Sequence, residues 1–96
     1  MKFAYLIMGK YDSNVDRAAL KEDKLQVIGV SDLDNACEVA VELCKSGVDC
    51  IEVCGAFGEK GAKRLIEATE NRITIGYITH LPEQDEIFRA TFSKKK

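Results

Sequence analysis

The sequence predicts an α/β fold: a single small domain with a mostly parallel sheet of four to five strands and three helices, in Rossmann-like or flavodoxin-like layers. From residue 25 onward, strand-like and helix-like patterns alternate three times, which is typical of βα repeats with a parallel sheet. Residues 2–9 form a nearly unbroken apolar run of strand length, which favours a strand buried on both faces. The 96 residues suffice for one core, so residues 1–96 form one domain, with the lysines at 94–96 as a frayed tail.

The first half of the chain begins with the strand over residues 2–9 and a polar loop over residues 9–14. Residues 15–21 fit either a short helix or the first arm of a hairpin that turns at residues 22–24. The hairpin is favoured because residues 25–30 read clearly as a strand. Ser31 is then expected to cap a helix that ends near Lys45 and Gly47 and buries one apolar face (Leu33, Ala36, Cys37, Ala40, Cys44).

The second half repeats the strand–helix unit. A strand over residues 48–54 leads into a helix after Gly58, with an i,i+4 pair of Glu59 and Lys63 and an end near Asn71. Residues 73–79 form the last strand. Pro82 begins the final helix, with a predicted buried stripe (Ile87, Phe88, Thr91, Phe92). Three helices cannot cover both faces of such a sheet, so we expect a homo-oligomer.

Composition excludes some classes of partner and compartment. The net charge is −2 and no basic face stands out, so nucleic-acid binding is not expected. No stretch approaches the length of a membrane span, and no cleavable signal follows the first apolar run. We therefore expect a cytoplasmic protein without a membrane partner, whose four cysteines are thiols.

Reactive side chains follow the predicted strands at their carboxyl ends, which meet at one edge of a parallel sheet and commonly bind ligands. Cys54 and His80 follow two of these strands, with Lys10, Thr79 and Glu83 nearby. A thiol beside an imidazole can act as a nucleophile, but a half-buried thiol beside a structural histidine fits the pattern better. Cys54, His80 and Glu83 are a conceivable metal set, but one histidine and no CxxC pair lead us to predict no metal site.

The glycine-bearing loop after the 48–54 strand contains Gly55, Ala56, Phe57 and Gly58 and opens a helix. Phosphate-binding loops occupy this position, but the G-x-x-G-x-x-G spacing matches neither the dinucleotide fingerprint nor the P-loop. A role in the turn alone is therefore favoured, because such loops need glycine for their backbone geometry.

Glu52 shares a strand face with Cys50 and Cys54. An acid in a central strand faces water, lines a site or pairs with a base such as Lys10 or Arg72. A carboxylate that points into a site binds a hydroxyl or amine, or acts as a general base. The structural and the functional interpretations of Glu52 are evenly balanced.

Two motifs, CGAFG at residues 54–58 and THLPEQD at residues 79–85, occur together with MKFAY and IMG near the start. In this combination the chain resembles a family of small bacterial proteins known only as a domain of unknown function. The resemblance implies a stand-alone bacterial cytosolic protein and supplies no activity or cofactor. Residues 47–58 are also similar to one βα unit of TIM-barrel enzymes, although the chain is too short for eight units.

The sequence thus favours a small-molecule-binding protein with its site at the strand carboxyl ends. The first alternative is a small enzyme, a lyase, an isomerase or a thiol-dependent hydrolase, with His80 or Glu52 as base and Cys54 as nucleophile or acid. The second is a structural or regulatory subunit without a small-molecule site.

Overall fold

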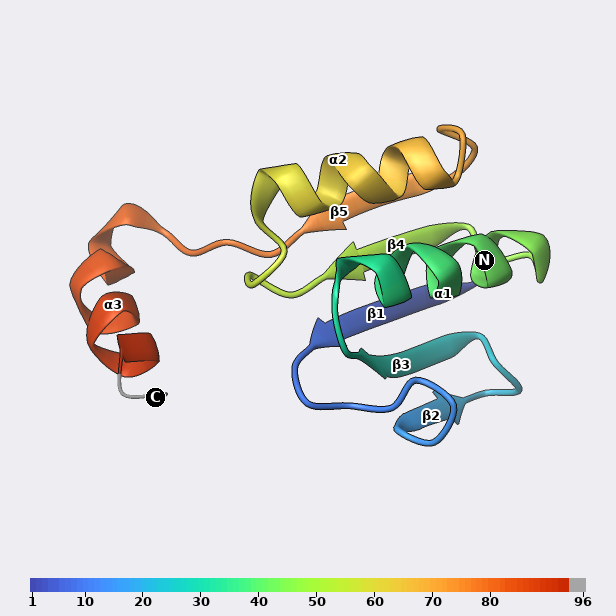
Figure 1. Cartoon of the computed structure of the whole chain (residues 1–96), viewed down its shortest axis with the longest axis horizontal. Coiled ribbons are helices and arrows are strands. Elements are labelled where there is room, and N and C mark those ends of the chain that lie inside the picture. Colours follow the sequence, from blue (N-terminus) through green and yellow to red (C-terminus); the bar gives the residue numbers. More distant parts are fainter. Residues whose placement is uncertain (94–96) are drawn as a thin grey trace.

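The computed structural model describes residues 1–93, so the predicted frayed tail at 94–96 lies outside the described residues. The chain forms the strands β1 (Phe3–Met8), β2 (Arg17–Leu20), β3 (Leu25–Val30), β4 (Cys50–Val53) and β5 (Thr74–Tyr77). The helices are α1 (Leu33–Lys45), α2 (Gly58–Ala68), the short 3₁₀ helix η1 (Pro82–Gln84) and α3 (Asp85–Ser93). The predicted α/β class, the number of α-helices and the mostly parallel sheet are confirmed (Figure 1).

The five strands form one sheet in the order β2-β3-β1-β4-β5. β2 pairs antiparallel with β3, which confirms the hairpin, while the other three pairs are parallel. The hairpin turn places Lys21, Glu22 and Asp23 at positive φ. The carboxyl ends of β1, β3, β4 and β5 therefore meet at one edge of the sheet.

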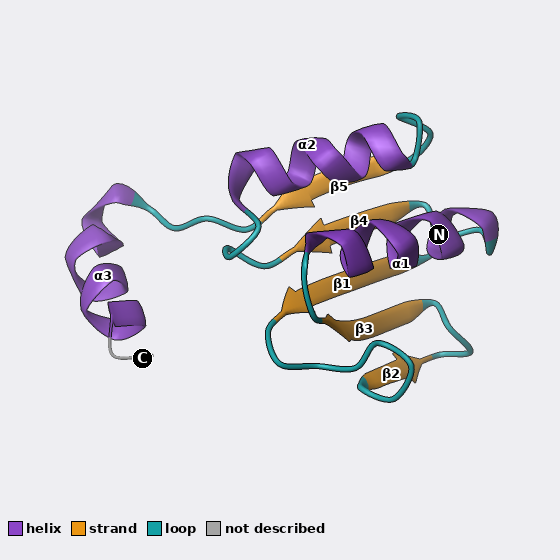
Figure 2. Ribbon diagram, in the orientation of Figure 1, coloured by secondary structure: helices purple, strands orange, loops and turns teal. Residues whose placement is uncertain are grey.

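Within residues 1–93, α1 and α2 are the helices that pack on the sheet, and both cover the same face (Figure 2). The core lies between this face and the two helices, where Leu6, Ile28, Ile51 and Leu65 are fully buried. Gly61 on α2 permits the helices to approach, because a Cβ there would lie 3.2 Å from Leu33 on α1. The molecule thus has a two-layer arrangement, with one face of the sheet left without a helix.

The residues on the uncovered side correct the prediction that residues 2–9 are buried on both faces. Ala4 and Leu6 are buried, but Phe3 is 45% exposed and Tyr5 only partly buried. We call this surface the open face; it consists of the strand residues that alternate with the core residues (Phe3, Tyr5, Ile7, Ala18, Leu20, Leu25, Val27, Gly29, Cys50, Glu52). The residues of β1 are apolar as predicted, but no helix in the described part of the chain covers those that lie on the open face.

The final helix differs most from the expectation. No residue of α3 is buried, so the predicted buried stripe of Ile87, Phe88, Thr91 and Phe92 is wrong within one chain. The reason is its position, because residues 79–93 extend beyond the carboxyl ends of the strands and leave α3 apart from the sheet (Figure 1). We call residues 79–93 the arm.

The start of α1 is shifted by one residue from the prediction. Asp32 rather than Ser31 is the N-cap, and its Oδ1 accepts a hydrogen bond of 2.7 Å from the Asn35 N–H. Asn35 Oδ1 in turn accepts a bond of 3.0 Å from the Ser31 N–H. The carboxylate is the stronger acceptor for a helix N-terminus, which accounts for the choice of Asp32. Gly47 follows the helix at φ +95°, in the left-handed region that favours glycine.

Candidate functional site

The predicted site residues divide into two groups at the carboxyl edge of the sheet. The first lies on or beside the sheet and contains Glu52, Cys54 and the loop over residues 55–58, with exposed Lys10 after β1. The second belongs to the arm and contains Thr79, His80 and Glu83. No hydrogen bond joins Cys54 to His80 within residues 1–93, and each has a different partner.

Tyr5, Glu52 and Cys54 lie near one another at β1 and β4, with Tyr5 and Glu52 on the open face and Cys54 half-buried against the core. Tyr5 of β1 lies opposite Glu52 of β4 in the parallel register, and neighbouring strands are about 4.8 Å apart. Cys54 follows two residues after Glu52, and its Sγ accepts a hydrogen bond of 3.3 Å from the Met8 N–H. Burial raises the pKa of Tyr5, and the neighbouring Cys54 raises it further.

Glu52 is exposed and, within residues 1–93, forms no ion pair. The two bases considered from the sequence are not its partners, since Arg72 pairs with Glu70 at 2.8 Å and Lys10 forms no ion pair in the same part of the chain. Among the alternatives set out above, the structure therefore favours an acid on a partly open face.

Tyr11, which no sequence pattern singled out, shapes the open face. Its ring lies against Gly29 and Gly9: a Cβ at Gly29 would come within 2.5 Å of Tyr11 Cγ, and one at Gly9 within 2.9 Å of Cε2. A groove of about 420 Å³ beside the ring is lined largely by β1, β3 and the segment into β2 (Ile7, Tyr11, Val15, Asp16, Arg17, Ala18, Val27, Gly29). The alternation of Phe3, Tyr5 and Ile7 was the available signal for this face, and it was hidden by the apolar residues between them.

The glycine-bearing loop after β4 has a clear structural role. Gly58 has φ +63°, and a Cβ at Gly55 would lie 3.4 Å from the Ile78 carbonyl oxygen. Phe57 is only 5% exposed and its ring belongs to the core, so the side-chain surface of the loop is limited to Ala56. These observations favour the turn role over phosphate binding.

His80 is held within the arm. Its Nε2 lies 2.7 Å from Asp85 Oδ1, and its ring stacks on Phe88 with 4.1 Å between the centroids. Its Nδ1 is buried and, among residues 1–93, has no hydrogen-bond partner. Phe88 also contacts Phe92, so a short row of three rings fixes the shape of the arm. Glu83 and Thr79 are exposed beside it.

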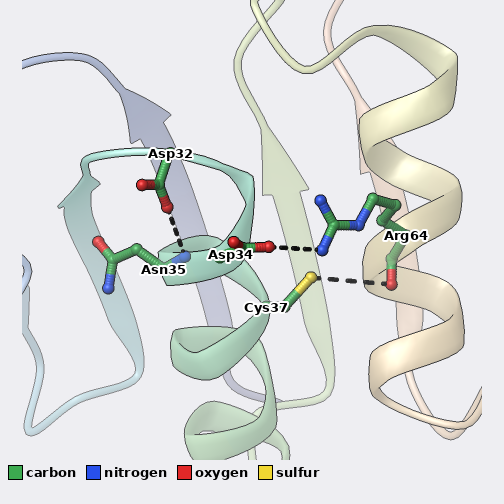
Figure 3. Close-up of polar contacts among 5 residues, drawn as sticks. All are labelled: Asp32, Asp34, Asn35, Cys37 and Arg64. Carbon is green, nitrogen blue, oxygen red and sulfur yellow. Dashed lines mark hydrogen bonds and ion pairs between the residues drawn. The ribbon is translucent and has the colours of Figure 1, made fainter.

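A second polar group lies on the helical layer, where α1 meets α2 (Figure 3). Arg64 pairs with Asp34 at 2.8 Å, and Cys37 Sγ lies 3.9 Å from the Arg64 carbonyl oxygen. Burial raises the pKa of the Cys37 thiol. These contacts connect the two helices, which gives the group a structural role.

Within residues 1–93, no three or more histidine, cysteine, aspartate or glutamate side chains are placed to hold a metal ion. In the same residues, no helix has the length and hydrophobicity needed to cross a membrane. All four cysteines are free thiols.

Comparison with known proteins identifies one relationship. A family model described as "Family of unknown function (DUF6506)" matches residues 1–93. No curated protein and no solved structure matches the chain.

Proposed function

We propose a binding function for this chain, which belongs to the DUF6506 family of unknown function: it holds a small molecule on the open face, at the carboxyl ends of its parallel strands. The observation that carries the proposal is Glu52, an exposed carboxylate without an ion pair among residues 1–93 on an otherwise largely apolar face. Glu52 is exposed in the single chain, and a carboxylate in a central strand is costly to bury without a partner, so a bound group that donates to it would offset that cost.

The surroundings of Glu52 define the chemistry of the ligand. The groove beside Tyr11 offers a largely apolar surface on β1 and β3, and Tyr5 and Glu52, which are outside its lining, offer polar groups on β1 and the next strand, β4. An apolar wall with a few polar groups that fix orientation is the usual composition of small-molecule sites. We infer a ligand with an apolar or aromatic body and an amine or hydroxyl group that donates to Glu52.

The remaining predicted residues take supporting roles in this proposal. Cys54 lies beside Glu52 and contributes a polarizable contact, and Gly55, Ala56 and Gly58 form the edge next to it. In this proposal Lys10 adds a polar group after β1, at the same edge of the sheet, and Thr79, His80 and Glu83 add polar groups on the arm, which extends beyond that edge. Phe57 supports the loop from the core and does not contact the ligand.

The open face also supports self-association, because it exposes apolar side chains that a second subunit would cover. We propose a homo-oligomer in a bacterial cytoplasm. The free cysteines agree with a reducing compartment, in which thiols persist.

A pair of fragments tests the ligand chemistry. ¹⁵N-labelled protein is titrated with benzylamine and, separately, with benzoate, and amide shifts are followed by NMR. We expect benzylamine to shift the amides of Tyr5, Glu52 and Cys54 and benzoate to leave them unchanged. Glu52→Gln should abolish the shifts, while Glu38→Gln, which removes an exposed acid on α1, should preserve them. Equal responses to both fragments, or shifts confined to other surfaces, would contradict the proposal.

A second candidate function is favoured by the contact between His80 and Asp85. An imidazole held by a carboxylate at 2.7 Å is a common arrangement for a general acid or base. In this alternative the protein is a lyase, an isomerase or a thiol-dependent hydrolase, with His80 or Glu52 as base and Cys54 as nucleophile or acid.

Thiol reactivity tests the version that uses Cys54. The alkylation rate of each cysteine is measured against pH by peptide mass spectrometry, with Cys37, Cys44 and Cys50 as internal controls. A nucleophilic Cys54 should react faster than the other three near neutral pH and slow down in His80→Ala. If Cys54 needs the alkaline conditions of an ordinary thiol and ignores His80→Ala, the thiol enzyme is excluded.

A further inference from the structure

We propose that the arm of one copy lies on the open face of a second copy, and that the exchange is reciprocal in a two-fold dimer. This inference rests on the self-association proposed above and does not require that a ligand binds. The two surfaces that meet are the arm and the open face, and the arm of the second copy then lines the proposed ligand site.

The arm exposes several large apolar side chains to solvent. Leu81, Ile87 and Phe92 are 65%, 63% and 56% exposed, and Phe88 is covered partly by His80. α3 has only nine residues, and a helix of that length is marginal in water without tertiary packing. Its formation therefore implies a surface on which the apolar side packs.

The open face also exposes apolar side chains that a second surface would cover. Phe3, Leu20, Leu25 and Val27 are between 41% and 62% exposed and lie together on β1, β2 and β3. Ile78, 45% exposed, lies apart from this patch, just beyond the carboxyl end of β5, with β4 between β5 and β1. Continuous apolar runs such as that of β1 are typical of parallel strands that are covered on both sides. Exposed patches of this kind mark interaction surfaces.

The area favours reciprocal exchange over a single contact. The large apolar side chains named above are each about half exposed. They give the open face about 400 Å² of exposed apolar surface, and they give the arm about the same area. One arm on one face then buries about 800 Å², whereas stable specific interfaces bury about 1,600 Å² in total. Two reciprocal contacts reach that size, which favours a second copy of this chain.

The direction of the arm also fits exchange. It extends beyond the carboxyl ends of the strands rather than folding over the sheet from which it comes (Figure 1). Exchange of an identical element between copies is a frequent route to dimers. Because a chain of this size cannot enclose a cavity alone, the arm of the second copy supplies the missing wall over Tyr5 and Glu52.

Charged substitutions on each surface test the proposal. Phe92→Asp alters the arm and Val27→Asp alters the face, and both side chains are exposed enough that each chain should fold, which circular dichroism checks. Ser93→Asp is the matched control, since it adds the same charge to α3 at an exposed residue that is not an i+3 or i+4 neighbour of Ile87, Phe88 or Phe92. In sedimentation velocity, wild type and Ser93→Asp should be dimers, and the other two variants should dissociate with constants about 100-fold higher, because each lost contact occurs twice.

A photo-crosslinking residue at position 92 shows where the arm lies. Unlabelled and ¹⁵N-labelled chains are mixed, irradiated and digested. We expect cross-links that join a peptide of the arm to a peptide of β1 or β3, with one peptide unlabelled and the other ¹⁵N-labelled. Cross-links within one chain would show that the arm folds onto its own sheet, and would overturn the proposal.

The other outcomes separate the proposals. If Phe92→Asp stays dimeric, arm exchange is wrong while self-association stands. If wild type is a monomer at every concentration, arm exchange and self-association are both wrong. The benzylamine titration then still tests the proposed ligand site.

Discussion

Tyr5 lies directly opposite Glu52, one on β1 and the other on the neighbouring parallel strand β4. A phenol and a carboxylate thus lie on neighbouring strands in the middle of a face whose other large side chains are apolar. A surface of this composition would be costly to leave in water, and costly to bury without a partner for the acid.

Replacing Glu52 with valine should not weaken the fold. The carboxylate forms no ion pair among residues 1–93, and valine is the better residue in a strand, so we expect the free energy of unfolding to rise by up to about 1 kcal/mol. Urea denaturation of wild type and Glu52→Val measures the difference. A loss of stability would indicate that Glu52 has a structural partner, and would remove the main support for the ligand site.

Gly29→Ala should be destabilising by about 1–3 kcal/mol, because its methyl group would overlap the Tyr11 ring. Gly76→Ala on β5 is the control, since nothing lies within 4 Å of a Cβ there. Urea denaturation compares the two variants. Because a Cβ at Gly29 would also lie 2.6 Å from Tyr11 Cβ, the cost of Gly29→Ala should largely vanish only when Tyr11 is replaced by glycine. A cost that persists in that double variant would show that the backbone at Gly29 matters rather than the Tyr11 side chain.

Asp32→Ala should cost about 1 kcal/mol of stability, because the helix loses the acceptor for the Asn35 N–H. Ser31→Ala should cost less, since the backbone N–H of Ser31 keeps its 3.0 Å hydrogen bond to Asn35 Oδ1 and only the longer bond of 3.4 Å from the hydroxyl is lost. Thermal unfolding of the two variants checks the order. A larger effect at Ser31 would restore the capping residue expected from the sequence.

The raised pKa of Tyr5 predicts a pH dependence in the alkaline range. Since the folded protein holds its phenol proton more tightly than the unfolded chain, whose value is about 10, the associated stability is complete below that pH. It is lost as the pH rises further, through the folded pKa. Urea denaturation across this range should show a shallower decline in Tyr5→Phe, and identical slopes would mean that Tyr5 is not desolvated.

Much of the fold could be predicted from local patterns. The hairpin, α1, α2 and the parallel strands each have their own signals, such as the Glu59–Lys63 pair, which the structure places at 3.2 Å, and the glycine at the end of α1. The error at Ser31 arose because two adjacent residues both suit an N-cap, and only three-dimensional contacts distinguish them.

The exposed surfaces could not be predicted in the same way. An apolar strand reads as buried whether its cover comes from the same chain or from another copy, which explains the error at β1. The stripe of Ile87 and Phe92 is apolar at helical spacing, but spacing does not say what packs on it. Tyr11 lies in a loop, where no periodicity links it to Gly29.

The candidate site was predicted in part. Strand direction predicts which chain segments reach the carboxyl edge, so Cys54 and His80 both follow strands that end there. It does not predict the direction of the arm, which gives His80 the partners Asp85 and Phe88 instead of the thiol.

Native mass spectrometry of the full chain, purified gently from the expressing cells, tests the central claim that the open face is a covered binding surface. We predict particles of two chains with additional mass from a retained small molecule, and loss of that additional mass in Glu52→Gln. A bare single chain at all concentrations, with no bound molecule, would contradict the account.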